Sequence, residues 1–276
     1  MTEKPVNIRP AWVDFHCHLD LYPDHATLIS ECDRERVATL AVTTTPKAWE
    51  RNQSLASGSE MVRVGLGLHP QLMSERASEI VLFEKLLAET RYVGEVGLDA
   101  GPKFYRSFEE QERIFARILS ACNEQGNKVL TIHSIRAASK VLNHLDRYLS
   151  PDRGKCVLHW FTGSNSEAKR ALDYGCYFSV NAEMLRSPKH RMLVAKLPLD
   201  RLLTETDGPF VERNGRPLRP RDISATVDGL AVVRDVPSSE MAKVILKNLA
   251  LQLPFLQVSE SMGNHDSKIV DAASVD

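Results

Sequence analysis

The 276-residue sequence lacks the features that mark several common classes of protein. Its five cysteines contain no C-x-x-C pair and are odd in number, which argues against a disulfide framework and a structural zinc ribbon and favours a reducing compartment. No stretch approaches the roughly 20 apolar residues of a membrane span, and the polar first ten residues have no apolar signal-peptide core. We therefore expect a cytoplasmic protein with no membrane segment.

A strong charge of either sign is also lacking, since 35 lysines and arginines face 36 aspartates and glutamates, for a formal net charge of −1. This balance excludes the strong positive field of a general nucleic-acid coat protein but leaves room for a local basic patch. The hydrophobic content of 43% and the charged content of 26% are ordinary for a soluble globular enzyme.

Short apolar, β-rich runs alternate with longer amphipathic segments, which is the pattern of parallel strands joined by crossover helices. The expected strands are Trp12–Leu19, Thr39–Thr44, Val62–Leu68, Tyr92–Leu98, Lys128–His133, Lys155–His159, Tyr177–Val180 and Arg201–Thr206. The expected helices include Glu75–Thr90, Phe108–Glu124, Arg136–Tyr148, Ser166–Tyr174 and a last helix over about 238–253. Eight such units in roughly 250 residues match an α/β TIM (β/α)8 barrel.

An open, doubly wound sheet is the alternative fold, but it normally has a glycine-rich phosphate turn after its first strand. Here that place holds Asp20-Leu21-Tyr22-Pro23-Asp24, without glycine. We therefore predict a single TIM-barrel domain over residues 1–256. The serine- and aspartate-rich residues 257–276 are expected to form a disordered tail.

The first strand contains a His-x-His pair, His16 and His18. Alternate residues of a strand point the same way, so both imidazoles can face one metal ion. Imidazole commonly joins carboxylates around catalytic divalent metals. The pair alone is equally compatible with a satisfied polar pair, so a metal site requires further ligands on neighbouring strands.

Catalytic groups of a barrel come from the carboxyl ends of several strands. Those ends supply His16, His18, His69, Glu95, Asp99, His133, His159, Glu205 and Asp207, which include five of the nine histidines. Four imidazoles and two carboxylates are enough for two divalent ions with one bridging carboxylate, and two such ions can clamp a phosphoryl oxygen. Glu95 lies between Gly94 and Gly97, which allow close approach, and is the natural bridging ligand.

Six strings of the sequence, in order, resemble the signatures of the TatD family of metal-dependent hydrolases. They are Asp14-Phe15-His16-Cys17-His18-Leu19-Asp20, Gly67-Leu68-His69-Pro70, Gly94-Glu95-Val96-Gly97-Leu98-Asp99, Ile132-His133-Ser134, His159-Trp160-Phe161-Thr162-Gly163 and Glu205-Thr206-Asp207-Gly208-Pro209-Phe210. The match runs from about residue 12 to residue 250. Each motif alone is unspecific, but the ordered set is highly specific.

The resemblance implies a TIM barrel of metal-dependent hydrolase type with two divalent ions and DNase activity, of the exonuclease kind. Carried over by position, it implies that His16, His18, Glu95 and Asp207 hold the first ion and that Glu95, His133 and His159 hold the second. Asp207 would also accept a proton from the attacking water. The identity of the ions stays open among zinc, manganese and magnesium.

Three further residues have both a functional and a plain interpretation. The resemblance places His69 near the scissile phosphate, with an ordinary loop-end histidine as the alternative. Glu205 and Asp99 would orient ligands, with buried capping carboxylates as the alternative.

Two departures from the family pattern concern arginines. Ile135 and Arg136 follow the Ile-His-Ser string, so either Arg136 replaces the usual arginine one position later or that contact is lost. The loop 209–220 is short and, with the residue that follows it, carries four arginines, Arg213, Arg216, Arg219 and Arg221, which can grip a phosphate backbone or form a solvated loop. Trp160 and Phe161 can stack on a base or pack in the core.

A narrower similarity, over residues 14–24 and 204–210, is to the TatD-like member of the Qat anti-phage defence cassette. It implies antiviral defence alongside the ATPase and the QueC-like protein of that cassette. The leading hypothesis is a metal-dependent DNase with DNA as its substrate. The same ions could instead serve ester or amide hydrolysis, such as D-aminoacyl-tRNA deacylation or amidohydrolase chemistry, and a catalytically quiet subunit of a defence complex is a third possibility.

Overall fold

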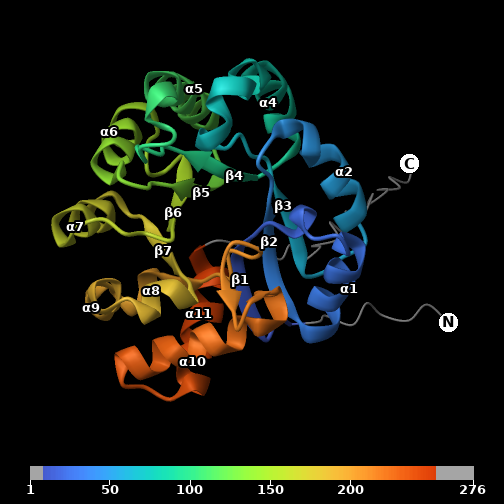
Figure 1. Cartoon of the computed structure of the whole chain (residues 1–276), viewed down its shortest axis with the longest axis vertical. Helices are drawn as coiled ribbons and strands as arrows, with labels where there is room; N and C mark the ends of the chain where they lie inside the picture. Colours follow the sequence, from blue (N-terminus) through green and yellow to red (C-terminus); the bar gives the residue numbers. More distant parts are fainter. Residues whose placement is uncertain (1–8, 253–276) are drawn as a thin grey trace, which may run out of the picture.

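The computed structural model describes residues 9–252, so the tail predicted over residues 257–276 lies outside the described part. Parallel strands stand at the centre and helices surround them (Figure 1). The central strands are β1 (Trp12–Cys17), β2 (Val37–Val42), β3 (Val62–Gly65), β4 (Tyr92–Gly97), β5 (Lys128–His133), β6 (Gly154–His159), β7 (Tyr177–Val180) and β8 (Leu202–Thr204). Each overlaps one of the eight predicted strands.

The strands form a closed barrel. Strands β1 to β3 and strands β4 to β8 pair in sequence order within two parallel sheets. Between β3 and β4, the Leu66 amide donates to the Tyr92 carbonyl at 2.9 Å. Between the ends of β8 and β1, the Asp207 amide donates to the His16 carbonyl at 2.9 Å. These bonds join the two sheets at both edges, and the predicted TIM barrel is confirmed.

The helices cover the outside of the barrel. They are α1 (His25–Glu35), α2 (Pro46–Ala56), α3 (Met73–Arg76), α4 (Ile80–Leu86), α5 (Phe108–Gln125), α6 (Ala138–Tyr148), α7 (Asn165–Tyr174), α8 (Ala182–Arg186), α9 (Pro188–Lys196), α10 (Ile223–Arg234) and α11 (Ser238–Gln252). Helix α5 shows how they pack: Ile114, Phe115 and Ile118 recur at helical spacing and are buried against the strands.

The prediction of one continuous helix over Glu75–Thr90 is wrong. The segment is broken into α3, a 3-10 turn at Ala77–Glu79 and α4. Glu79 is buried at this break, where its Oε1 lies 2.8 Å from Nη1 of Arg76 and 2.9 Å from Nζ of Lys47. The two ion pairs hold the buried carboxylate in place at the break.

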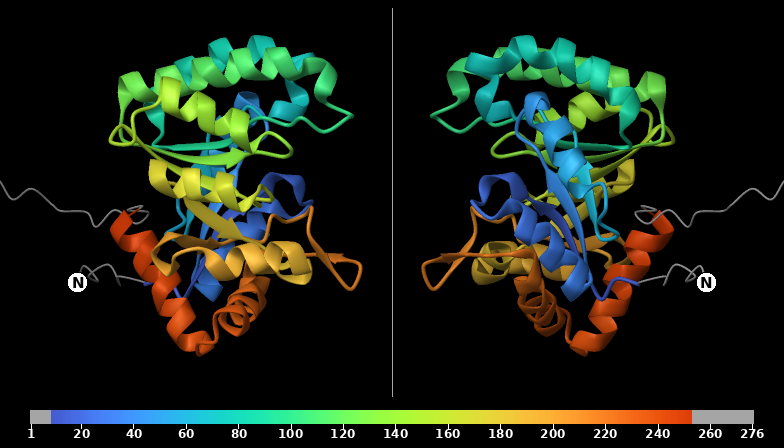
Figure 2. Two further views of the ribbon diagram at one scale, coloured as in Figure 1. Left: turned by 90° about the vertical axis from the view of Figure 1, so that its left-hand side faces the viewer. Right: turned by 90° about the vertical axis from the view of Figure 1, so that its right-hand side faces the viewer.

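The loop 209–220 contains a short hairpin that we did not predict. Strands β9 (Glu212–Arg213) and β10 (Arg216–Pro217) pair antiparallel around Asn214 and Gly215, which have φ values of 54° and 72°. Positive φ at both positions is what a two-residue hairpin turn requires, and Asn-Gly is its strongest sequence signal. The hairpin projects from the rim of the barrel (Figure 2, orange).

A buried carboxylate helps to close the barrel at β1. Asp14 accepts hydrogen bonds from the backbone amide of Thr206 at 2.8 Å and from its hydroxyl at 2.6 Å. Burial raises the pKa of Asp14 to about 7. The side chain shares the inward face of β1 with His16, so this contact ties the first strand to the segment that carries Asp207.

All five cysteines are buried and carry free thiols. Cys17 faces away from the two histidines that flank it, in the hydrophobic core. Within residues 9–252, none of the helices combines the length and the apolar character needed to cross a bilayer.

Candidate metal centre

The six predicted ligands lie together at the carboxyl ends of the strands, around the carboxylate of Glu95. All six are buried: His16, His18, Glu95, His133, His159 and Asp207. A cavity of about 210 Å³ is lined by five of them, all but His16, and also by Trp160 and Phe210. The structure thus brings four histidines, from the ends of β1, β5 and β6, to the carboxylate of Glu95 on β4.

One group of atoms has the spacing of ligands around a single cation. Nε2 of His16 lies 3.3 Å from Oε2 of Glu95 and 3.7 Å from Oδ1 of Asp207. Nε2 of His18 lies 3.2 Å and 3.6 Å from the same two oxygens. Two donor atoms that are each about 2.1 Å from one ion, at tetrahedral or octahedral angles, are roughly 3.0–3.4 Å apart.

The other oxygen of Glu95 faces a different pair of histidines. Oε1 lies 2.7 Å from Nδ1 of His133 and 3.0 Å from Nε2 of His159. The two oxygens of one carboxylate therefore point to two separate sets of imidazoles. This is the geometry that a bridging ligand between two ions needs.

The fit of cations to this centre can be tested on the protein atoms themselves. Nε2 of His16 and Oδ1 of Asp207 are buried and have no hydrogen-bond partner among the described residues. Buried polar atoms without partners are rare because their desolvation is not compensated. Cations at the centre would satisfy both atoms, so the residues present fit divalent metal ions.

Grouping the ligating atoms by proximity alone gives partly different sets. His16, His18 and Asp207 form one group, but His16, His159 and Glu205 form a second, and His69, Glu95 and His133 form a third. Glu205 and His69 enter these groups although protein partners already occupy their polar atoms. We therefore assign both to supporting positions.

Glu205 is held by three donors from the neighbouring strand ends. Its Oε1 accepts from the Trp160 amide and from Nδ2 of Asn181, each at 3.0 Å, and its Oε2 accepts from the Ser179 hydroxyl. Nδ1 of His159 lies 3.4 Å from Oε1. The carboxylate is thus placed behind His159 and can fix the orientation of that ring.

Asp99 has the same relation to His133. Its Oδ2 lies 2.9 Å from Nε2 of His133 and accepts from Nε2 of Gln71 at 2.8 Å, while its Oδ1 accepts from the Gly101 amide at 2.7 Å. With Nε2 of His133 directed at Asp99, the Nδ1 atom is left to face Glu95 and the centre. The contact selects which ring nitrogen is available as a ligand.

His69 lies at the edge of the centre with a defined tautomer. Its Nδ1 accepts a hydrogen bond from the Gln71 amide at 3.1 Å. Burial lowers the pKa of His69, so the ring is neutral and its single proton sits on Nε2. That nitrogen lies 3.2 Å from Oε2 of Glu95 and can donate a hydrogen bond into the cavity.

Charge coupling across the cluster shifts several pKa values. Burial opposes ionisation of Glu95, but His69, His159 and His16 outweigh it and hold its pKa well below the usual range. Burial, together with His159, lowers the pKa of His16. Burial raises the pKa of Asp207 well above normal, and the nearby carboxylates add to this. Burial and the neighbouring carboxylates therefore disfavour the charged form of Asp207, which cations at the centre would favour.

The local sequence explains why Glu95 can occupy the middle of this cluster. A Cβ on Gly94 would collide with the Thr131 methyl group, and a Cβ on Gly97 would collide with the His133 carbonyl. Both glycines let β4 approach β5 closely. The close approach carries the Glu95 carboxylate to within hydrogen-bond distance of His133.

The predicted rim arginines have different fates. Arg136 is exposed and lines a hollow next to the metal cavity. Ser134 lines both the hollow and the cavity. The structure does not bring Arg216 to the centre; this exposed residue lies on β10 and lines a separate hollow of about 630 Å³. Phe161 is fully buried and packs on Phe178, so it belongs to the core.

Three supporting residues were not predicted from the sequence. Thr131 is hydrogen-bonded to Nδ1 of His16 at 2.7 Å, which leaves Nε2 for the centre. It lies two residues before His133, so strand alternation could have placed it on the same face. Asn181 directly follows β7 at the catalytic rim, and Gln71 lies two residues after His69.

Comparisons with known proteins agree with this geometry. The family model described as TatD-related DNase matches residues 13–252. The metal-dependent hydrolase YjjV of Escherichia coli strain K12 is 31% identical over 255 residues, which cover 86% of this chain and 95% of YjjV. Human deoxyribonuclease TATDN3 is 28% identical over 266 residues, which cover 89% of this chain and 95% of TATDN3. The crystal structure of E. coli YjjV superposes with a TM-score of 0.76 at 27% identity, over 87% of this chain and 96% of YjjV. The chain therefore belongs to the TatD family, the TatD-related DNases, and is a metal-dependent hydrolase of that family.

Proposed function

We propose that this hydrolase is a DNase that cleaves phosphodiester bonds at the Glu95 centre, with two divalent cations and a water as the nucleophile. One observation carries the proposal. Each Glu95 oxygen faces its own pair of histidines, and the pair nearer Asp207 includes a buried nitrogen without a hydrogen-bond partner. When bound, two divalent cations supply charge that lowers the pKa of water and stabilises a phosphoryl oxygen during displacement.

Protein residues bind the two cations and accept a proton. His16, His18, Glu95 and Asp207 would hold one cation, and Glu95, His133 and His159 the other. The Asp207 carboxylate, which lines the metal cavity, accepts the proton of the attacking water.

Three further residues orient the reacting groups. His69 donates a hydrogen bond from Nε2 to a non-bridging oxygen of the scissile phosphate, in place of its contact with Oε2 of Glu95. Asp99 and Glu205 keep the rings of His133 and His159 in the orientation that a cation needs.

The name of the human relative, deoxyribonuclease TATDN3, supports DNA as the substrate. The experiment incubates the purified protein with 5′-labelled and 3′-labelled DNA in Mg²⁺, Mn²⁺ or Zn²⁺ and compares it with His16→Ala and Asp207→Ala. We expect cation-dependent release of nucleotides from one end, lost in both variants. Hydrolysis of aminoacyl esters with no cleavage of any DNA would replace DNase activity by the deacylase alternative.

The antiviral role remains a proposal that rests on the sequence similarity to the Qat cassette protein. It predicts that the chain copurifies with the ATPase and the QueC-like protein of that cassette from cells that express all three. Loss of phage resistance in Asp207→Ala, with the complex intact, would link the role to hydrolysis. Full resistance in that variant would favour a catalytically quiet subunit.

A further inference from the structure

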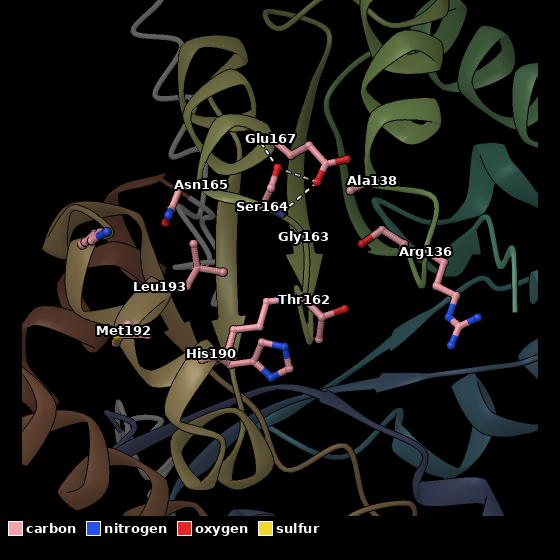
Figure 3. Close-up of a pocket in the computed structure, with 13 residues that line it drawn as sticks. Arg136, Ala138, Thr162, Gly163, Ser164, Asn165, Glu167, His190, Met192 and Leu193 are labelled. Atoms are coloured by element: carbon pink, nitrogen blue, oxygen red, sulfur yellow. Dashed lines mark hydrogen bonds between the residues drawn. The ribbon is translucent and has the colours of Figure 1, made fainter.

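A second hollow lies beside the metal cavity on the same rim of the barrel. It has a volume of about 610 Å³, and its lining comes from the segments after β5, β6 and β7, including Ser134, Thr162 and helix α9 (Figure 3). We call it the lateral groove. Ser134 lines both the groove and the metal cavity, so the two spaces adjoin.

The lateral groove is cationic in a chain that is nearly neutral. Arg136, Lys189 and Lys196 line it, and all three are exposed. None of them forms an ion pair with a residue in the described part of the chain. The lining carboxylate, Glu167, accepts hydrogen bonds from the Ser139 and Ser164 amides at 3.0 and 2.8 Å, so it is engaged elsewhere. These three cations are thus available to an anionic ligand.

The sizes of the two spaces indicate an extended substrate. The metal cavity, at about 210 Å³, is smaller than the roughly 300–1,000 Å³ of ordinary ligand pockets, whereas the groove falls inside that range. The cavity has room for the scissile group, and the rest of a long substrate needs a neighbouring channel. The groove begins where the cavity ends.

An exposed aromatic ring stands at the mouth of the metal cavity. Phe210 is 60% exposed, and its ring lies 5.1 Å from the His18 ring in an edge-on arrangement. Proteins that bind single-stranded nucleic acid combine a cationic groove along the backbone with aromatic rings on which bases stack. The rim of this barrel has both elements.

We propose that the lateral groove binds the phosphates adjoining the scissile bond of a single nucleic-acid strand, through Arg136, Lys189 and Lys196. This inference rests on the proposed function and assigns the groove and its three cations a role in holding the part of a long substrate that lies outside the metal cavity. The arrangement predicts that the groove contributes to the binding of long substrates and nothing to the hydrolysis step itself.

The test compares Lys189→Ala/Lys196→Ala with the wild type on a single-stranded decanucleotide and on bis(p-nitrophenyl) phosphate, which is too small to reach the groove. We expect a roughly tenfold higher KM for the decanucleotide and unchanged kinetics on the small diester. The salt slope of decanucleotide binding should become shallower by about 1.4, since each single-strand phosphate contact contributes about 0.7. The matched control is Lys155→Ala/Lys243→Ala, which removes two exposed lysines outside the groove and should leave both substrates unchanged.

Equal effects of the groove variant on both substrates, or no effect on either, would overturn the proposal. Should the wild type cleave no DNA, the proposed function fails while the groove is still tested. In that case, fluorescence anisotropy of a labelled decanucleotide with EDTA-treated protein provides the readout. Weaker binding by the groove variant than by the control supports the groove, and equal binding refutes it.

Discussion

Two clusters of charged side chains lie at the catalytic rim, and they differ in whether protein partners satisfy their buried polar atoms. Around Glu31 of α1, Nε of Arg219 lies 3.2 Å from Oε1 and Nη1 of Arg221 lies 3.1 Å from Oε2. Arg219 also contacts Asp24 at 2.8 Å. Around Glu95, the partners are histidines, and buried atoms of His16 and Asp207 have no partner among the described residues.

The difference shows how a folded chain distinguishes a structural cluster from a reactive one. The Glu31 cluster pairs permanent guanidinium charges with carboxylates, so it is neutralised by the protein alone. The Glu95 cluster holds its carboxylates among buried imidazoles whose pKa values are shifted in opposite directions, down at His16 and His69 and up at His133 and His159. Added cations can satisfy its buried atoms that lack a partner, whereas the Glu31 cluster requires none.

The largest expected effect comes from exchanging one carboxylate in each cluster. Glu95→Gln should lower hydrolysis at least 1,000-fold, equivalent to about 4 kcal/mol, because it removes the bridging charge while keeping the shape. Glu31→Gln should instead weaken the fold and leave the activity of the folded fraction within severalfold. Activity assays and urea unfolding of both variants provide the measurement. Comparable activity losses in Glu95→Gln and Glu31→Gln would contradict the assignment of one cluster as reactive and the other as structural.

Divalent cations should stabilise the protein only through the Glu95 cluster. A cation at 100 times its dissociation constant adds about 2.7 kcal/mol to the free energy of unfolding. Thermal unfolding with EDTA and then with excess Zn²⁺, Mn²⁺ or Mg²⁺ measures this increment. Asp207→Ala should lose most of it, and Arg219→Ala should keep it. An unchanged melting temperature with all three cations would contradict the assignment of the centre.

Removing the main cation of the Glu31 cluster should destabilise the fold. In Arg219→Ala, the buried Glu31 keeps Arg221 but loses the guanidinium that donates to both of its oxygens, at a cost of about 2 kcal/mol. Arg213→Ala, on the exposed hairpin of the same loop, is the matched control and should stay within about 0.5 kcal/mol of the wild type. Urea denaturation measures both. Equal stability of the two variants would show that the ion pairs are not structural.

The comparison also shows how far the sequence predicts such clusters. The strands and the six candidate ligands were predictable because strand alternation and barrel topology bring strand ends to one rim. The partners of Arg219 and Arg221, at the end of the arginine-rich segment, were not predictable, because both contact Glu31 about 190 residues away in sequence. The number of arginines suggested phosphate binding, yet two of them are engaged by α1. Whether an arginine is available to bind phosphate depends on the carboxylates that the fold places beside it.

The smallest effect concerns the pH dependence of the Glu31 cluster. The hydrogen bond from Arg219 lowers the pKa of Asp24 below its usual value, with a smaller contribution from Arg221. A carboxyl whose pKa is lower in the folded state stabilises that state above the unfolded pKa, near 4, and this contribution disappears as the pH falls through the folded value. Wild type should therefore exceed Asp24→Asn in unfolding free energy at pH 7, with the gap closing below pH 4. Urea midpoints from pH 7 to pH 3.5 measure the gap, and a gap that widens toward acid would reverse the sign we assign to the Asp24–Arg219 pair.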